Sequence, residues 1–526
     1  MLTVSSLLEK GYFPKELPPP FTTAKFAEVM TKHAQSLPGN FGTPPSARLT
    51  MYNLARPGTL RRTLGIPNPV VYYNLCLEVK NNWKDIESQL KRSTLAGVTA
   101  TKPGGNGRAV ISSHLDKFTS LRATSRASAR YLLKADISRF YPSIYTHSIP
   151  WAVHGKLIAK ANRNKKKKDA LYGDALDKWA RKCQDDQTMG LPIGPDTSFI
   201  LSELVLAAVD ETLSTKVKKL KGFRHVDDYE LCFNTMSGAQ KALATLQEGL
   251  TQFELALNPV KTRIYELPLP LEKPWANELR TFDFRNAGES DLVRFFDRAF
   301  VLMKENPDES VLSYAIARTN SIIIGEDIWE LFENLVLHCM HVEPNTTRPA
   351  LEQFLRYKDK DYSINLALLS DVLNNQIRYH APLGHSSEVA WALWALIEFK
   401  CVIRVTTVKI VTDLDDPLAA LLALDAEQRG LLRSKLDLSR WASCKRKSEL
   451  YGANWLLSYE GNLKGWLPSK GTSDYVNEDE RFAAMKKLGV TFYNPNATID
   501  FTPLPQTDVS ELSGVQYESD DDDVDI

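Results

Sequence analysis

GFRHVDDYELCF, residues 222–233, places two adjacent carboxylates between short apolar and aromatic segments. These flanking segments predict two strands joined by a tight turn. Because adjacent aspartates repel each other, Asp227 and Asp228 destabilise such a turn unless something neutralises them. A pair of hard divalent cations would do so. The stretch therefore predicts a metal-binding turn between two strands.

A third carboxylate, Asp136, ends another predicted strand that begins at residue 131. Transfer of a phosphoryl group from a triphosphate to a hydroxyl uses two metal ions roughly 3.5–4 Å apart. Such a pair of ions needs carboxylates from two structural elements, which adjacent strands of one sheet would supply. The predicted order is strand, helix, strand pair, helix and strand over residues 131–264. This order is similar to the palm of template-copying polymerases and predicts an α+β fold.

Composition excludes several classes of protein. The 526 residues include 65 Lys and Arg against 64 Asp and Glu, so net charge predicts no partner. Six cysteines without a shared metal-ligand spacing indicate reduced thiols in the cytoplasm. No apolar run reaches the roughly 18 residues of a membrane span. None of the nine histidines is expected to join a metal-ligand cluster. We expect a cytoplasmic protein with no membrane partner.

Five motifs in order resemble those of reverse transcriptases over residues of about 60–265. They are LRRTLGIPNP (60–69), KADISRFYPSI (134–144), GLPIGPDTS (190–198), HVDD (225–228) and LNPVKT (257–262). The resemblance implies the fingers and palm of a right-hand polymerase. It also implies a DNA polymerase activity that uses dNTPs.

A narrower resemblance is to the abortive-infection and defence-associated reverse transcriptases of bacteria. It rests on SIYTHSIPW (143–151) and on the opening GYFPKELPPPF (11–21). Members of that group carry a C-terminal helical-repeat domain, and several assemble into trimers or hexamers. Several build single-stranded DNA without a conventional template, primed by a tyrosine of the protein itself, whereas others use a partner non-coding RNA. The resemblance thus implies a homo-oligomer, a DNA product covalently attached to the chain, or an RNA partner.

Five segments are expected along the chain. They are a Pro-rich N-terminal arm (1–50), fingers (51–135), a palm with the catalytic motifs (136–280), a C-terminal α-helical repeat-like domain (285–505) and an acidic disordered tail (506–526). The arm is predicted to be extended around one short helix near residues 22–36. The helical segment is predicted from apolar residues at helical spacing.

The resemblance implies a role for each matching residue. Asp136, Asp227 and Asp228 would bind two Mg²⁺ ions, with Mn²⁺ as the alternative. Tyr141 would be the steric gate against the 2′-hydroxyl of a ribonucleotide; the alternative is a core tyrosine. The glycines and basic residues assigned to nucleotide binding are Gly190, Gly194, Lys261, Arg61 and Arg62. For Lys261 the alternative is a solvated surface lysine.

Other residues are assigned to nucleic acid or to priming. Arg122, Arg126 and Arg130 recur every four residues, which predicts one basic helical face for a nucleic-acid backbone. Lys166 lies in a run of four lysines, predicted either to lie near template or product or to be a solvated loop. Tyr12 and Tyr52 are candidate protein primers, since a flexible arm would bring a hydroxyl to the metals. The alternative for both is an aromatic anchor.

Two residues depart from the reverse transcriptase pattern. Ile193 stands where the family has Gln, and His225 where Tyr or Phe is usual. Both departures disfavour ordinary template copying. We expect an antiphage DNA polymerase that makes single-stranded DNA, with protein priming and without a template. The alternatives are an RNA-directed polymerase that copies a non-coding RNA, and a nucleic-acid-binding scaffold with a vestigial polymerase fold.

Overall fold

The computed structural model of the chain describes eight stretches. They are residues 2–33, 41–58, 60–97, 108–110, 115–162, 171–285, 288–467 and 474–501. The acidic tail expected at 506–526 and the lysine run that contains Lys166 lie outside the described residues.

A four-stranded antiparallel sheet carries the metal-binding motifs. Its order is β4-β5-β3-β6, formed by Lys221–His225, Asp228–Phe233, Tyr131–Asp136 and Arg263–Glu266. Helices α5 (Leu115–Arg126) and α11 (Met236–Gln252) both contact the sheet. The strand pair around the Asp-Asp turn is therefore as predicted.

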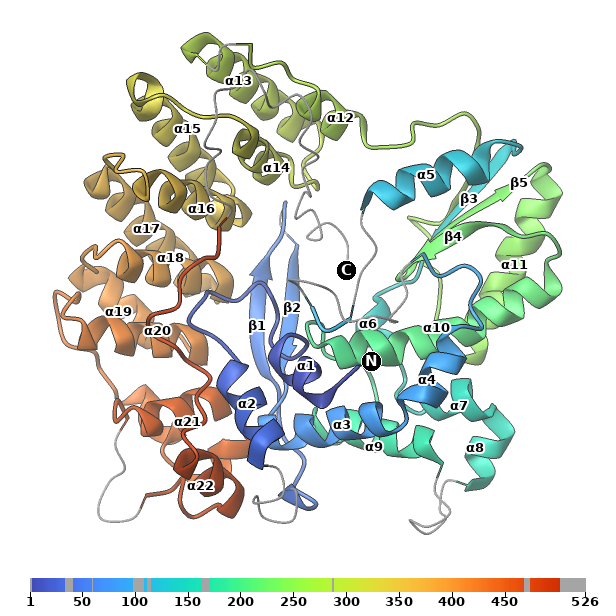
Figure 1. Cartoon of the computed structure of the whole chain (residues 1–526), viewed down its shortest axis with the longest axis horizontal. Coiled ribbons are helices and arrows are strands. Elements are labelled where there is room, and N and C mark those ends of the chain that lie inside the picture. The colour runs from blue at the N-terminus through green and yellow to red at the C-terminus, as the bar shows by residue number, and fades with distance from the viewer. Residues whose placement is uncertain are drawn as a thin grey trace.

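Helix α10 (Asp196–Lys216) supports the sheet from the centre of the molecule (Figure 1). It begins directly after Pro195, whose extended backbone ends the preceding loop. Its buried side chains lie on every face, among them Ile200, Leu204 and Val209. A helix that is apolar all round belongs inside a core. Four smaller helices precede it in the chain, and of these α7 packs against α10: α6 (Phe140–Ser143), α7 (Ser148–His154), α8 (Lys156–Asn162) and α9 (Tyr172–Lys182).

The fingers consist of a hairpin and two helices. Strands β1 (Thr50–Ala55) and β2 (Arg61–Ile66) pair antiparallel, and α3 (Pro69–Asn81) and α4 (Trp83–Leu90) follow. Asn68 caps α3 by accepting a hydrogen bond from Val70 N, and Pro69 occupies the first helical position, where its missing N–H is not needed.

The N-terminal segment differs from the predicted extended arm. It contains two helices, α1 (Val4–Glu9) and α2 (Ala24–His33), where one was expected. The segment is also packed against the far end of the chain: Thr22 N donates to Phe492 O, and Asn494 N donates to Pro20 O. Buried aromatic side chains explain this, because they stabilise the segment only when something covers them.

The described chain beyond residue 288 is helical and contains no strand. Helix α12 (Pro274–Arg280) precedes this region. The α-helices of the region itself are α13 (Glu289–Glu305), α14 (Val311–Arg318), α15 (Trp329–Val342), α16 (Thr347–Lys358), α17 (Leu366–His380), α18 (Ser386–Glu398), α19 (Val405–Asp413), α20 (Pro417–Gln428), α21 (Trp455–Leu463) and α22 (Glu480–Lys487). Figure 1 shows these helices as an arc that faces the palm across the β1–β2 hairpin. The whole is an α+β fold with polymerase fingers and palm followed by a helical C-terminal region. Within the described residues, no helix has the length and apolar character needed to span a membrane.

The arc closes back onto the fingers. Helix α18 contacts β1, and residues just before α21 bond to the base of the hairpin. Thr50 Oγ1 donates to Ala453 O over 2.6 Å, and Asn68 Nδ2 donates to Leu450 O over 2.7 Å. The helical region therefore buttresses the fingers.

Candidate active site

The three predicted metal ligands lie where β3 ends and β5 begins. Asp136, the last residue of β3, lies directly opposite Asp228, the first residue of β5. Opposed residues of an antiparallel pair have Cα atoms roughly 4.5–5.5 Å apart. Asp227 precedes Asp228 in the turn that joins β5 to β4. Strand pairing alone thus gathers three carboxylates at one edge of the sheet.

A strained two-residue turn presents Asp227. His225 pairs with Asp228, so Val226 and Asp227 form the loop between β4 and β5. Val226 has φ 49°, a left-handed conformation that is unusual for a β-branched side chain. Such conformations persist where surrounding contacts hold them, and they gather at functional sites. The turn therefore needs an external restraint.

Arg224 supplies that restraint from below the turn. Its Nη1 donates to Val226 O over 2.7 Å. The same guanidinium bonds two carboxylates of α10: Glu203 at 2.7 and 3.1 Å, and Asp210 at 2.9 Å. Tyr229, on β5, donates its hydroxyl to Asp210 over 2.9 Å. The network ties both strands of the catalytic hairpin to the central helix.

Burial removes the three charged groups of this network from water, which costs free energy unless they pair with one another. The Arg224 side chain is 1% exposed. Burial alone would lower the pKa of Arg224, but Asp210 and Glu203 raise it well above its ordinary value. For Glu203 burial outweighs Arg224 and leaves the pKa raised. The cation and its two carboxylates depend on one another.

Sequence reasoning missed this network, although a signal was present. Glu203 and Asp210 are seven residues apart in an otherwise apolar helix, so they lie on the same face. Arg224 interrupts the short strand before the turn. Two carboxylates on one apolar helix face and one arginine in a buried strand together predict a buried ion pair.

Tyr141 lies beneath the loop of the GLPIG motif. It is buried at the start of α6, and its carbonyl accepts a hydrogen bond from Leu191 N over 2.9 Å. Burial raises the pKa of the Tyr141 hydroxyl, and the charges of Glu203 and then Asp227 raise it further. Asp227 is thus electrostatically close to this ring.

Gly190 and Gly194 pack closely against Pro142 and Pro14. Both have positive φ, 88° and 123°. A Cβ at Gly194 would lie 2.7 Å from Cγ of Pro14, and one at Gly190 would lie 3.3 Å from Pro142 O. Arg108 bonds the same loop, donating to Gly194 O, to Phe13 O at 2.7 Å and to Asp196 at 2.7 Å. These contacts lock the loop onto the N-terminal segment.

Lys261 reaches one of the predicted metal ligands directly. Its Nζ lies 3.1 Å from Asp136 Oδ2, while 61% of its side chain remains exposed. The loop that carries Lys261 is fixed by Asn258 N, which donates to Asp136 O over 2.7 Å. A cation between solvent and the carboxylates is suitably placed to meet a phosphate.

Arg61 has a use that the sequence did not predict. Its Nη1 and Nη2 donate to both oxygens of Glu388 on α18, over 2.5 and 2.6 Å, and Nε donates to Asn53 over 2.8 Å. A bidentate pair of this kind satisfies the guanidinium, so Arg61 joins the hairpin to α18 in this conformation, and its contact with a triphosphate stays a prediction. Arg62 follows it on β2 and pairs with Leu54 across the hairpin.

The basic stripe of α5 is also engaged within the protein. Arg122 and Arg126 both bind Glu230, at 3.0 and 2.9 Å. They therefore dock α5 onto β5, whereas a nucleic-acid contact was predicted. Arg130 is 72% exposed and lies 3.5 Å from Glu266. Of the stripe, Arg130 retains the solvent access that a backbone phosphate requires.

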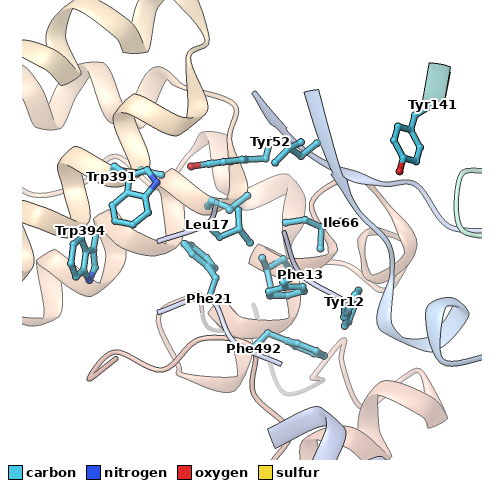
Figure 2. Packing of buried hydrophobic residues seen from close by; sticks show 14 of the residues in the cluster. Tyr12, Phe13, Leu17, Phe21, Tyr52, Ile66, Tyr141, Trp391, Trp394 and Phe492 are labelled. Carbon is cyan, nitrogen blue, oxygen red and sulfur yellow. The ribbon is translucent and has the colours of Figure 1, made fainter. Parts of the chain in front are cut away.

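The candidate priming tyrosines are buried. Tyr12 donates its hydroxyl to Pro67 O over 2.5 Å and stacks on Tyr72 with ring centroids 4.2 Å apart. Tyr52 has its hydroxyl 3.5 Å from Glu16 O, beside Trp391. Both tyrosine side chains are fully buried, and Figure 2 shows Tyr12 beside Phe13 and Tyr52 with its hydroxyl toward Trp391. The predicted flexible carrier is thus a packed anchor in this conformation, because burying these aromatic rings stabilises the fold.

The residue types where β3 ends and β5 begins suit a pair of hard cations, although His380, His385 and Glu388 form the one described group whose ligand atoms already converge. The palm residues offer carboxylate oxygens from two strands, the ligands that Mg²⁺ prefers. Asp136 is 7% exposed, so its charge is largely removed from water. The sequence expectation of a metal pair is chemically consistent with these residue types.

Comparison with known proteins identifies the class. A family model described as reverse transcriptase (RNA-dependent DNA polymerase) matches residues 96–295, which include all three aspartates. The chain therefore carries a reverse transcriptase domain, and it is a nucleotidyltransferase of the DNA polymerase class. No match was found among curated proteins. Among solved structures, apo telomerase from Candida tropicalis is 12% identical, covering 74% of this chain and 76% of that one with a TM-score of 0.30. A likeness that slight says nothing further about this chain.

Proposed function

We propose that this chain is a cytoplasmic antiphage-defence polymerase that synthesises single-stranded DNA from dNTPs by two-metal phosphoryl transfer. It would belong with the abortive-infection reverse transcriptases. The observation that carries the proposal is the pairing of Asp136 with Asp228 beside Asp227 in the turn. Carboxylates from two structural elements at one sheet edge suit a two-metal site.

Asp136, Asp227 and Asp228 would hold two Mg²⁺ ions, or Mn²⁺ in their place. When bound, such ions lower the pKa of an attacking hydroxyl and stabilise the leaving pyrophosphate. The protein's own part is positional. Arg224 holds the turn carbonyl, so Asp227 keeps a fixed direction. Lys261, at Asp136 Oδ2, would meet the phosphates of the nucleotide from the solvent side.

The surroundings of the site favour untemplated synthesis. Ile193 uses its carbonyl to accept a hydrogen bond from Gly65 N over 2.9 Å, and its side chain packs on the core. An apolar side chain offers a base no hydrogen bond. His225 packs edge-on against Phe118 of α5, with ring centroids 4.7 Å apart. We infer that Ile193 and His225 support the structure of the palm and do not contact the incoming nucleotide.

Priming by a tyrosine of the protein remains part of the proposal. Tyr12 or Tyr52 would have to leave its packed position to reach the metals, because both hydroxyls are buried. Assembly as a homo-oligomer, a trimer or hexamer, likewise remains part of the proposal.

A second function, RNA-directed synthesis on a partner non-coding RNA, is favoured by one observation. The matching family model is described as RNA-dependent DNA polymerase. The two functions share the metal chemistry and differ in what selects the incoming base.

Purified chain with Mg²⁺ and labelled dNTPs, without added template, tests the proposal. We expect labelled DNA that partitions with protein into phenol until protease releases it. Tyr12→Phe and Tyr52→Phe variants identify the priming residue. Random or composition-biased product sequence supports untemplated synthesis, whereas a defined sequence that disappears after ribonuclease treatment supports the RNA-directed function. If no DNA forms, or if Asp227→Ala/Asp228→Ala labels equally, a nucleic-acid-binding scaffold is the better explanation.

Tyr141 is expected to select deoxynucleotides through its ring. Tyr141→Ala should raise incorporation of ribonucleotides relative to deoxynucleotides by about tenfold or more, because a pocket contact of this size discriminates by such factors. Tyr141→Phe is the matched control: it keeps the ring and loses only the hydroxyl. Competition between labelled dNTP and NTP measures the ratio. Unchanged selectivity in Tyr141→Ala would make Tyr141 a core residue.

A further inference from the structure

Two histidines and a glutamate converge far from the palm, where α17 meets α18. His380 ends α17, His385 follows the intervening turn, and Glu388 lies in the first turn of α18. Within the part of the chain that the structure describes, these residues form the one group whose ligand atoms lie close enough to share a metal ion. The sequence analysis predicted no histidine cluster. This one was missed because its residues are five and three positions apart, from His380 to His385 to Glu388, and a turn separates the two helices that carry them.

The three ligand atoms form a nearly equilateral triangle. Nδ1 of His380 lies 2.9 Å from Nδ1 of His385. Each Nδ1 lies 3.5 Å from Oε1 of Glu388. Bonds of roughly 2.0–2.1 Å from Zn²⁺ to nitrogen and oxygen, at tetrahedral angles, put ligand atoms about 3.3 Å apart. The triangle therefore matches one face of a tetrahedral site.

We propose that His380, His385 and Glu388 bind Zn²⁺, or another transition-metal ion with the same preference for imidazole, with the fourth position open to water. The backbone prepares this site. His385 N donates to His380 O over 3.2 Å, and Gly384 at φ 68° turns the chain between them. Both histidines are therefore held side by side by the turn itself.

A second shell orients the glutamate. Arg61 donates to both of its oxygens, and Ser387 Oγ donates to Oε2 over 2.6 Å. The Glu388 side chain is 1% exposed, so these partners fix its direction. Hydrogen bonds to a ligating carboxylate are a regular part of metal sites. Oε1 retains a lone pair toward the two histidines.

The charges at the site select the kind of ion. Two of the three ligand atoms are imidazole nitrogens, which transition-metal ions prefer. Arg61 cancels the single carboxylate charge, so a hard ion held by charge, such as Mg²⁺ or Ca²⁺, has little to attract it. An ion that gains from nitrogen ligands is favoured instead.

The site sits at a joint between fingers and helical region. The hairpin bonds the same turn twice more: Asn53 Nδ2 donates to Gly384 O over 3.0 Å, and Ala55 N donates to Ser387 Oγ over 2.8 Å. An ion that rigidifies this turn would fix the point where the β1–β2 hairpin rests on α18. The metal would thus act on this joint, independently of the palm carboxylates.

Metal binding by the full chain in an Asp227→Ala/Asp228→Ala background tests the proposal, because that background weakens the palm as a competing site. After dialysis against chelator, Co²⁺ serves as the spectroscopic probe and Zn²⁺ as its competitor. We expect one Co²⁺ per chain with the strong visible absorption of a four-coordinate ion, displaced by Zn²⁺. His385→Ala should weaken binding by about a hundredfold or more. His341→Ala, an exposed histidine of α15, should bind like the parent.

Thermal melts keep the result interpretable. Zn²⁺ should raise the melting temperature of the parent and of His341→Ala but not that of His385→Ala, provided that the circular dichroism of all three agrees. If His385→Ala does not fold, the Co²⁺ spectrum of the parent decides. Absence of a four-coordinate spectrum in the parent, or equal Co²⁺ affinity in a folded His385→Ala, would show that the two imidazoles merely share a hydrogen bond.

Discussion

Asp227→Ala is expected to abolish nucleotide incorporation while leaving the fold intact. Metal ions stabilise several kcal/mol of transition-state charge, and about 4 kcal/mol corresponds to roughly a thousandfold in rate. Asp227 lies in the turn and not in a strand, so its removal breaks no ladder hydrogen bond. It also removes one of two adjacent like charges. We therefore expect a loss of about a thousandfold or more in rate, with unchanged or slightly higher stability.

Two measurements on the same preparations test this prediction. The rate of labelled dNTP incorporation gives the loss of activity, and the melting temperature gives the change in stability. Asp297→Ala, an exposed aspartate of α13, is the matched control and should behave like the parent. Asp136→Asn should lose activity similarly, since the amide keeps the shape but not the charge. Substantial activity in Asp227→Ala would contradict the assignment of the metals to this turn.

The palm around Asp227 was predictable because its signals are local. A turn between two apolar segments became β4 and β5, and an apolar run after Pro195 became α10. The pairing of Asp136 with Asp228 followed from motif order, since these elements form one sheet. The pairing of β3 with β5 is a contact between distant segments, but the order of the motifs predicts that these segments are neighbours in one sheet.

Partners far apart in the sequence were not predictable, because an arginine can bind either a phosphate or a carboxylate of the protein. Arg61 and Glu388 are 327 residues apart in sequence, and the length and charge of Arg61 suit a triphosphate equally well. For Arg122 and Arg126 the helical period gave the shared face correctly. It did not say that Glu230 would lie under that face. The helical period predicts which residues share a face, whereas the packing of the whole chain determines which residues that face contacts.

Arg224→Met is expected to produce the largest loss of stability among single substitutions near the site. The change leaves Glu203 and Asp210 buried without their cation, and breaking a buried pair in this way costs about 3–5 kcal/mol. Denaturant unfolding measures that loss. Arg263→Met, an exposed arginine on β6 of the same sheet, is the matched control and should change stability by about 0.5 kcal/mol or less.

A second variant separates charge from shape. Arg224→Met with Glu203→Gln removes one buried anion together with the cation, so it should recover part of the lost stability if the unpaired charge is the cause. It should not recover activity, because the bond from Arg224 to Val226 O is still missing and the strained turn is no longer held. Recovery of both would make Arg224 a purely structural residue. Recovery of stability alone would mean that the Arg224 guanidinium positions Asp227. Glu203 and Asp210 of α10 would then serve to hold Arg224 against the turn.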